Sequence, residues 1–176
     1  FVAPGTLHSI GPGLVLCEIQ QNSDLTYRLF DFGRLDSDGK SRPLHIAQAI
    51  AITKQETHPG PIPSFRFPGA PGNRELLAAC RYFAAERFEW EDRLDYKPDS
   101  SHADLLIFLR GSGHIGDEAY TAGDAYLIPA EVSAFAIAAS SCTEIIRSYV
   151  PDLDVLRNEL LQAGMSALQI QRIVVE

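Results

Sequence analysis

The 176-residue sequence lacks the features of a membrane protein, a disulfide-stabilised secreted protein or a nucleic-acid-binding protein. No apolar run approaches the roughly 20 residues that a membrane helix needs. Only three cysteines occur, Cys17, Cys80 and Cys142, and they form no CxxC pair and leave an odd thiol. Because 23 acidic residues outnumber 15 basic ones, the net charge of −8 disfavours broad contact with a phosphate backbone, although a few local cations could still bind a small anion. With no basic and apolar leader at its start, the sequence predicts a cytoplasmic protein.

What the sequence does contain is a series of short β-prone runs. Leu14–Gln20 and Leu25–Asp31 are predicted strands, and Leu44–Thr53 is a predicted short helix with Pro43 near its first turn. Residues 54–73 are rich in proline and glycine, which predicts a linker without a helix or a central strand.

After this segment the β-prone runs resume and glycines separate several of them. Short strands at such spacing favour a sandwich or barrel, with strands at Glu75–Trp90, Asp104–Arg110, Ala119–Thr121, Ala125–Pro129, Ala134–Ala138 and Thr143–Val150. The tail has helical spacing instead. It predicts helices at Asp152–Ala163 and Ser166–Val174, with Ser166 and Gln169 as a capping-box pair.

The segment before Gln20 places polar side chains in a pattern that could carry chemistry. If Gly11-Pro12-Gly13 is a three-residue hairpin loop, His8 faces Leu16, and Glu18 lies on the same face. His8 and Glu18 would then be diagonal neighbours, roughly 7–8 Å apart at the backbone. This face is either an ordinary solvated face or a metal ligand beside a general acid or base.

One histidine does not make a zinc site, because zinc takes about three or four protein ligands. The other histidines do not lie at ligand spacing and are predicted to be ordinary surface or core residues: His45, His58, His102 and His114. The region 74–150 likewise offers no cluster of ligand-type residues and is interpreted as structural. The orientation of Arg28 depends on the loop that follows Glu18 and stays open, and Arg34 follows it after a glycine.

The stretch PGTLHSIGPGLVLCEIQQNSDLTYRLFDFGR resembles the C-terminal part of the catalytic domain of type I mannose-6-phosphate isomerases. More loosely, RPLHIAQAI resembles the segment that leaves that domain, and FLRGSGHI with GDAYLIPAEV resembles the second, non-catalytic cupin domain. The resemblance implies an all-β fold of cupin jelly-roll barrels with a short helical tail. It divides the chain into part of a catalytic cupin domain (1–53), a linker (54–73), a complete second cupin-like domain (74–150) and the tail (151–176).

The resemblance also implies a zinc-dependent aldose–ketose isomerase that interconverts mannose 6-phosphate and fructose 6-phosphate. His8 falls on a metal ligand for Zn²⁺, and Glu18 on a carboxylate that faces the substrate and could transfer a proton. Arg28 falls on the arginine that stabilises the enediol-like intermediate. Arg34 occupies the place of a lysine near the substrate phosphate, where a guanidinium fork suits the same role.

One departure from the family pattern concerns the other metal ligands, a Gln-x-His pair that precedes His8 and a further glutamate. Only seven residues precede His8, and the chain opens on Phe1. We therefore expect a C-terminal fragment that is inactive alone and whose partner is the missing N-terminal half. Two alternatives stay open: another metal-dependent phosphosugar enzyme of the cupin type, and a non-catalytic sugar-binding or regulatory cupin.

Overall fold

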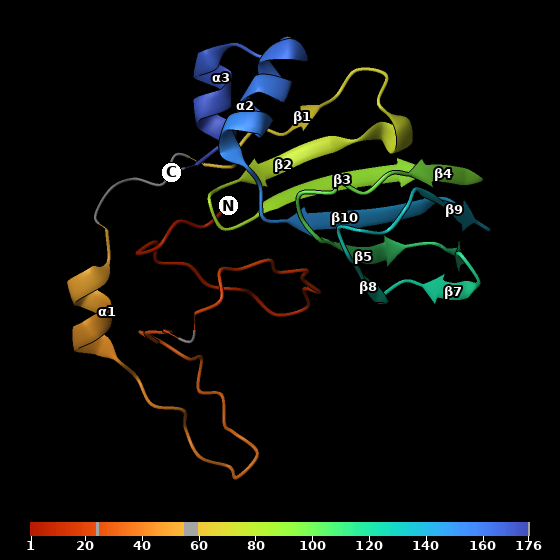
Figure 1. Ribbon diagram of the computed structural model, residues 1–176. Helices are drawn as coiled ribbons and strands as arrows, with labels where there is room; N and C mark the ends of the chain where they lie inside the picture. The colour runs from red at the N-terminus through yellow and green to blue at the C-terminus, as the bar shows by residue number, and fades with distance from the viewer. Residues whose placement is uncertain (24, 55–59, 176) are drawn as a thin grey trace. The chain divides into compact units, whose positions relative to one another are not determined.

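The computed structural model describes residues 1–23, 25–54 and 60–175, so His58 lies outside the described residues. The chain divides into two compact units, Phe1–Gly60 and Pro61–Glu176 (Figure 1). Within the described ranges, no helix is both long and apolar enough to cross a membrane.

The second unit consists of ten strands and two α-helices in its described residues. The strands are β1 (Phe65–Arg66), β2 (Glu75–Ala79), β3 (Ala84–Trp90), β4 (Arg93–Tyr96), β5 (Asp104–Arg110), β6 (Ser112–Ile115), β7 (Glu118–Thr121), β8 (Ala125–Ile128), β9 (Phe135–Ala139) and β10 (Thr143–Tyr149). A short 3₁₀ helix, η1 (Pro71–Asn73), precedes β2, and the helices α2 (Leu153–Gln162) and α3 (Ala167–Ile173) follow β10.

The strands form two antiparallel sheets. One has the order β1-β2-β3-β10-β5-β8, and the other has the order β4-β9-β6-β7. Side chains from both sheets meet in one apolar cluster that includes Phe88, Leu106, Tyr120 and Ile137. Two antiparallel sheets closed on a shared core form a jelly roll, so the all-β cupin-type fold predicted from the sequence is confirmed.

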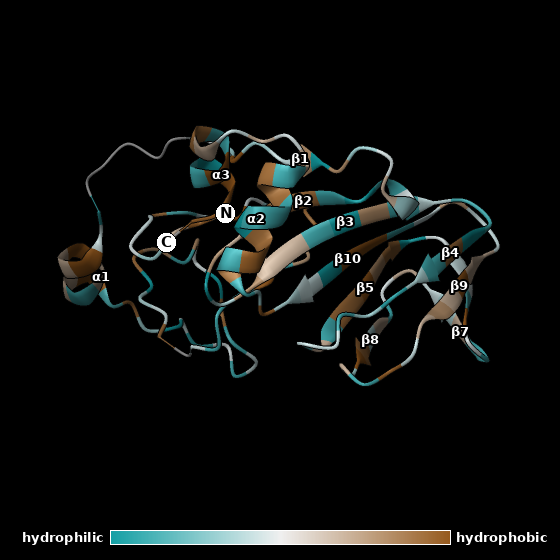
Figure 2. Ribbon diagram, turned by 45° about the horizontal axis from the view of Figure 1, so that its top comes forward, coloured by the Kyte–Doolittle hydropathy of each residue, from teal (hydrophilic) through white to brown (hydrophobic). Residues whose placement is uncertain are grey.

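Alternation of side chains determines which residues of the six-stranded sheet reach this core. Along β3 every second residue is buried, and β3 pairs with β10 over its whole length, from Thr143 opposite Trp90 to Tyr149 opposite Ala84. Figure 2 shows the apolar character of the neighbouring β5, whose Phe108 stacks on Tyr120 with ring centroids 4.0 Å apart.

The helical tail covers the rest of the same sheet, beside β1 and β2 (Figure 1). Asp152 caps α2 by accepting hydrogen bonds from the backbone N–H groups of Asp154 and Val155. Ser166 and Gln169 form the capping box that the sequence predicted for α3. Leu156 and Leu160 of α2 are buried in a second apolar cluster, together with residues of β2 and α3.

Several details of this unit differ from the sequence prediction. The predicted strand Glu75–Trp90 is interrupted by a tight turn at residues 80–83, where the N–H of Cys80 donates to the carbonyl of Phe83. The turn lacks glycine, proline and asparagine, which removes the usual signal for a hairpin. The strands β4 and β6 were not predicted. The segment predicted as a linker contributes the short edge strand β1 and the 3₁₀ helix η1.

In the first unit, the helix α1 (Ile46–Ile52) lies inside the predicted range Leu44–Thr53. The predicted strands Leu14–Gln20 and Leu25–Asp31 are wrong for this structure, because no strand forms among the described residues of Phe1–Gly60. An isolated strand pair is marginal in water without a third strand or a packed face, and here Val15 is fully exposed. The supposed hairpin face of His8 and Glu18 is therefore not formed.

Adjacent leucines on α2 test how the tail stabilises the second unit. Leu160 is fully buried, whereas Leu161 is 50% exposed. We expect Leu160→Ala to lower the free energy of unfolding by about 2–5 kcal/mol through lost burial and a residual cavity. Leu161→Ala, the matched control, should cost less than about 1 kcal/mol. Urea denaturation of both variants measures the difference, and equal costs would show that α2 does not pack as described.

Candidate functional site

A tight turn at Asp31-Phe32-Gly33-Arg34 begins and ends on a charged residue. The N–H of Arg34 donates to the carbonyl of Asp31 at 3.0 Å, and Phe32 and Gly33 both have positive φ, 54° and 68°. Glycine adopts this conformation freely, but a bulky residue such as Phe32 is strained in it. Backbone strain of this kind gathers at functional sites, which makes the turn a candidate for function.

Asp31 is the centre of an arginine cluster. The guanidinium of Arg42 donates to both of its carboxylate oxygens, from Nε to Oδ2 at 2.7 Å and from Nη2 to Oδ1. The Nε atom of Arg28 lies 3.6 Å from Oδ1. The hydrogen bonds from Arg42 lower the pKa of Asp31, and the charges of Arg42, Arg28 and Arg34 lower it further. Three cations around one carboxylate leave a local positive surplus, which suits a small anion.

Arg28 is held at both its backbone and its side chain. Its N–H donates to Nδ1 of His45 at 3.2 Å, and its carbonyl accepts from the N–H of His45 at 2.7 Å. Its Nη1 donates to the carbonyl of Pro43 at 3.5 Å. Of the two predicted arginines, Arg28 forms an ion pair with Asp31, whereas Arg34 ends the same turn and acts on that carboxylate through its charge. The structure adds Arg42 and His45 to this group.

His8, the predicted metal ligand, is exposed, and its Nδ1 donates to the carbonyl of Thr6 at 2.9 Å. A neutral imidazole with its proton on Nδ1 has its lone pair on Nε2, which is how histidine ligands of metals are commonly oriented. A complete zinc site needs further donors, and the described part of the chain contains no group of three His, Cys, Asp or Glu residues that could hold a metal ion. The residues present therefore do not fit a zinc ion by themselves.

Glu18, the predicted proton-transfer residue, is also exposed. Within the described residues, no hydrogen bond or ion pair joins it to His8 or to Arg28. Among the described residues, therefore, Arg28 and Arg34 lie near Asp31, but no hydrogen bond or ion pair joins His8 or Glu18 to them.

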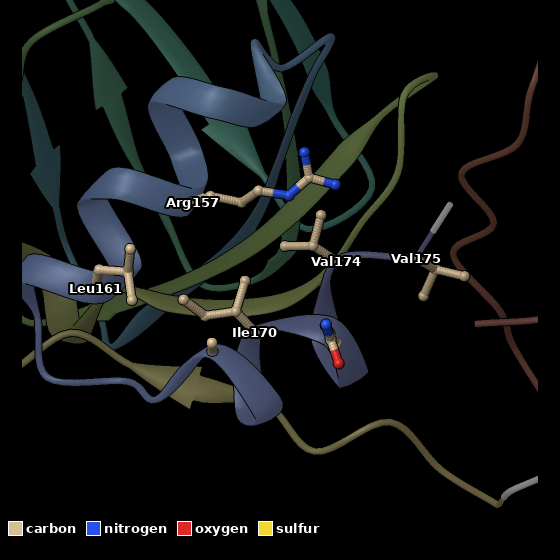
Figure 3. A pocket seen from close by; sticks show the side chains of 7 residues that line it. Arg157, Leu161, Ile170, Val174 and Val175 are labelled. Carbon is tan, nitrogen blue, oxygen red and sulfur yellow. The ribbon is translucent and has the colours of Figure 1, made fainter.

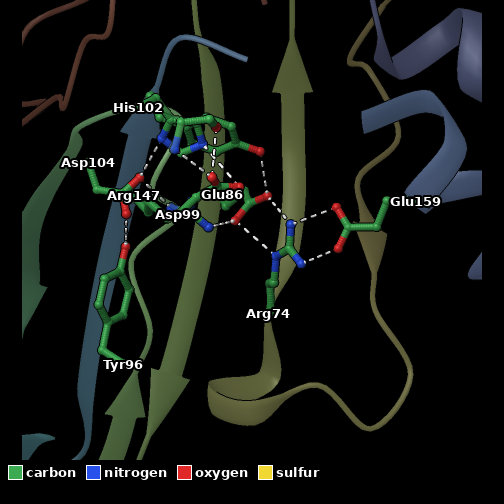
Figure 4. Close-up of polar contacts among 10 residues, drawn as sticks. Arg74, Glu86, Tyr96, Asp99, His102, Asp104, Arg147 and Glu159 are labelled. Carbon is green, nitrogen blue, oxygen red and sulfur yellow. Dashed lines mark hydrogen bonds and ion pairs between the residues drawn. The ribbon is translucent and has the colours of Figure 1, made fainter. Parts of the chain in front are cut away.

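A second polar cluster, which the sequence interpretation missed, lies inside the second unit (Figure 4). Glu86 of β3 is fully buried and accepts hydrogen bonds from Arg74 at 3.0 and 2.6 Å, from Arg147 at 3.3 Å and from the hydroxyl of Tyr149 at 3.0 Å. Arg74 also donates to Glu159 of α2 at 2.5 and 3.2 Å. Its burial lowers the pKa of Arg74, but the bonds to both glutamates outweigh burial and raise it.

The cluster continues to Asp104, which is fully buried at the start of β5. Asp104 accepts from Nε of Arg147 at 2.8 Å and from the hydroxyl of Tyr96 at 2.6 Å. His102 has its Nδ1 3.3 Å from Asp104 without hydrogen-bond geometry, and its ring stacks on Tyr149 at 4.3 Å. The carboxylates and guanidinium groups of this cluster pair with one another, so we assign the cluster a structural role. The region 74–150 is interpreted in the same way from the sequence.

A signal for this cluster was present in the sequence. Alternation along β3 places Glu86 on the inward face between Ala84 and Phe88, and an inward glutamate requires a buried cation. The alternation of side chains along β3 does not identify that cation, because Arg147 lies 61 residues away from Glu86 in the sequence.

An open groove of about 490 Å³ lies between α2, α3 and the residues that follow them (Figure 3). Its described lining is mostly apolar and includes Leu161, Ile170 and Val174 beside Arg157. That described lining includes no histidine, cysteine or carboxylate, so these residues provide neither a general acid or base nor a metal ligand.

No protein-family model matches the chain. It is 31% identical over 150 residues to the putative mannose-6-phosphate isomerase YvyI of Bacillus subtilis, a match that covers 83% of this chain and 47% of that protein. It is also 31% identical to the mannose-6-phosphate isomerase ManA of the same organism, over 73% of this chain and 42% of that protein. A stretch of 52 residues is 50% identical to the mannose-6-phosphate isomerase of Streptococcus mutans, over 30% of this chain and 16% of that protein.

Among solved structures, the crystal structure of the mannose 6-phosphate isomerase from Bacillus subtilis superposes with a TM-score of 0.61 at 28% identity. The superposition covers 72% of this chain and 41% of that one. The chain thus spans less than half the length of the Bacillus relatives that it matches.

The buried carboxylate at the centre of the second unit gives a direct test of the structural role. Glu86→Gln leaves Arg74 and Arg147 without their shared negative charge, so we expect the free energy of unfolding to fall by about 3–5 kcal/mol. Glu159→Gln removes a 42% exposed carboxylate from the same Arg74 and should cost at most about 1 kcal/mol. Urea denaturation measures both, and a neutral Glu86→Gln change would remove this carboxylate from the structural role.

Proposed function

The chain belongs to the mannose-6-phosphate isomerase-like cupins, and on this basis we propose that it works as the C-terminal half of a cytoplasmic enzyme that interconverts mannose 6-phosphate and fructose 6-phosphate. The arginine cluster at Asp31 is the observation that carries the proposal. In a chain with a net charge of −8, Arg28, Arg34 and Arg42 gather near the single carboxylate of Asp31, and such a local surplus of positive charge suits a phosphosugar.

We propose that the two predicted arginines, Arg28 and Arg34, bind different groups of the substrate. The exposed Arg34 follows the turn and can bind the phosphate through its planar guanidinium fork. The side chain of Arg28 is 23% exposed and donates to the backbone of Pro43, while its backbone pairs with His45, as suits a group that stabilises charge at a defined place. We assign it to the oxyanion that develops on the substrate carbonyl.

Isomerisation removes a proton from the carbon next to the carbonyl and returns a proton to the neighbouring carbon. The bonding electrons pass into an enediol-like intermediate and then back, so no oxidant or reductant is consumed. A carboxylate of suitable position performs both transfers, and we propose Glu18 for this role. Its exposure in this chain leaves it accessible to the other half of the enzyme.

We further propose that the enzyme binds Zn²⁺ and that His8 supplies one ligand through Nε2. The hydrogen bond from its Nδ1 to Thr6 supports this assignment, because it orients the ring and leaves Nε2 as the acceptor. The remaining ligands would come from the half of the enzyme that this chain does not span.

Turnover of the full-length enzyme tests the role of Glu18. We expect Glu18→Gln to lower kcat for fructose 6-phosphate formation by at least about 100-fold, the usual scale for loss of a general acid or base. The control Glu118→Gln changes an exposed glutamate of β7 and should leave kcat unchanged. Near-normal turnover of Glu18→Gln would remove Glu18 from proton transfer, and an inactive wild-type enzyme would refute the proposed reaction.

Metal analysis tests the ligand assignment without reference to activity. The 176-residue chain should bind no stoichiometric zinc, because one histidine is too few ligands, whereas the full-length enzyme should bind it. His8→Ala should remove the metal from the full-length enzyme, and His114→Ala, which changes an exposed histidine of β6, should not. Stoichiometric zinc in the isolated chain would contradict the assignment.

A further inference from the structure

The residues Arg42-Pro43-Leu44-His45, here called the RPLH segment, contact Arg28 through Pro43 and His45 and its neighbour Asp31 through Arg42. The proposed reaction gives this segment no role. We propose that Arg42 and His45 are positioning residues that hold Arg28 in place and keep its charge available to the substrate. The inference rests on the proposed function, since it takes Arg28 as the group that contacts the reacting substrate.

His45 fixes the backbone of Arg28 through two hydrogen bonds. Its ring accepts from the N–H of Arg28 at 3.2 Å, and its own N–H donates to the carbonyl of Arg28 at 2.7 Å. The ring also meets Tyr27 edge to face, with centroids 6.1 Å apart. These contacts replace the ladder of a β-sheet, which the described residues around Arg28 do not form.

Arg42 acts on the side chain of Arg28 through a shared neighbour, Asp31. Asp31 lies three residues after Arg28 and is the acid closest to it in the described ion pairs. A free carboxylate at this distance would bind the Arg28 guanidinium in a bidentate pair and neutralise it. Arg42 already occupies both oxygens, at 2.7 Å on Oδ2 and with a second bond on Oδ1.

The observed distances agree with this competition. The Nε atom of Arg28 lies 3.6 Å from Asp31, which is beyond a hydrogen bond, whereas Arg42 is in direct contact. Because Asp31 already lies this close to Arg28, loss of Arg42 would leave both carboxylate oxygens open to the Arg28 guanidinium. Arg42 therefore leaves donors of Arg28 free for a developing oxyanion.

Single and double variants of the full-length enzyme test the role of Arg42. In Arg42→Gln, the Asp31 carboxylate should form a direct ion pair with the Arg28 guanidinium. We then expect kcat to fall by about 10- to 100-fold with little change in KM, as for a misplaced catalytic group. In the double variant Asp31→Asn/Arg42→Gln the competing carboxylate is gone, and kcat should return to within about 3-fold of wild type. Because removal of both partners of a salt bridge can also restore stability, urea denaturation of the same variants accompanies the kinetics, and a positioning role changes kcat without a matching change in the free energy of unfolding.

Arg93→Gln is the matched control, because it breaks an exposed arginine–aspartate pair in the second unit and should leave kcat unchanged. For His45, the variant His45→Asn preserves an acceptor near Nδ1 and should keep more activity than His45→Ala. Wild-type kcat in Arg42→Gln, or a double variant as impaired as the single one, would overturn the proposal.

NMR of the arginine Nε–Hε groups separates this proposal from the proposed function. In Arg42→Gln the Arg28 signal should shift and exchange more slowly with water, and in the double variant it should return to its wild-type position. A wild-type enzyme without isomerase activity refutes the proposed function alone. An Arg28 signal that does not respond to Arg42→Gln refutes the positioning role, whatever the activity.

Discussion

The buried carboxylate of Glu86 is the constraint on which the second unit depends. On β3 it lies between Ala84, which belongs to the apolar cluster under the helices, and Phe88, which belongs to the cluster between the sheets. A charge at this boundary is stable only with partners, and Arg74 and Arg147 supply them. Through Arg74 and Glu159 the same network reaches α2, so one set of ion pairs joins the barrel to its helical tail.

Arginine–carboxylate pairs differ in charge balance between the two units. Around Glu86 the donors and acceptors of the cluster pair with one another, which leaves a closed interior. Around Asp31 one carboxylate pairs with Arg42 and Arg28 and also feels the charge of Arg34, so positive charge remains beside a strained turn. The surplus of charge, rather than the number of ion pairs, distinguishes the candidate site from the structural cluster.

Local pattern predicted much of the second unit and of the tail, because alternation, helical spacing and capping act over a few residues, as in β3, α2 and the Ser166–Gln169 pair. Local pattern gave wrong or incomplete predictions where the structure of a segment depends on residues far away in the sequence. Leu14–Gln20 has strand composition, but no strand forms among the described residues of its own unit. At the candidate site the motif identified Arg28 and Arg34, whereas Arg42 and His45 lie 11 and 17 residues from the groups they bind and follow no sequence period.

Burial is distributed very unevenly between the two units. Among the described residues of Phe1–Gly60 only Ala49 is buried, while the apolar clusters lie in Pro61–Glu176. The heat-capacity increase of unfolding follows the apolar surface that becomes exposed to water. A calorimetric transition of this chain therefore reports almost entirely on the barrel and its tail, and the segment that carries the arginine cluster melts without a signature of its own.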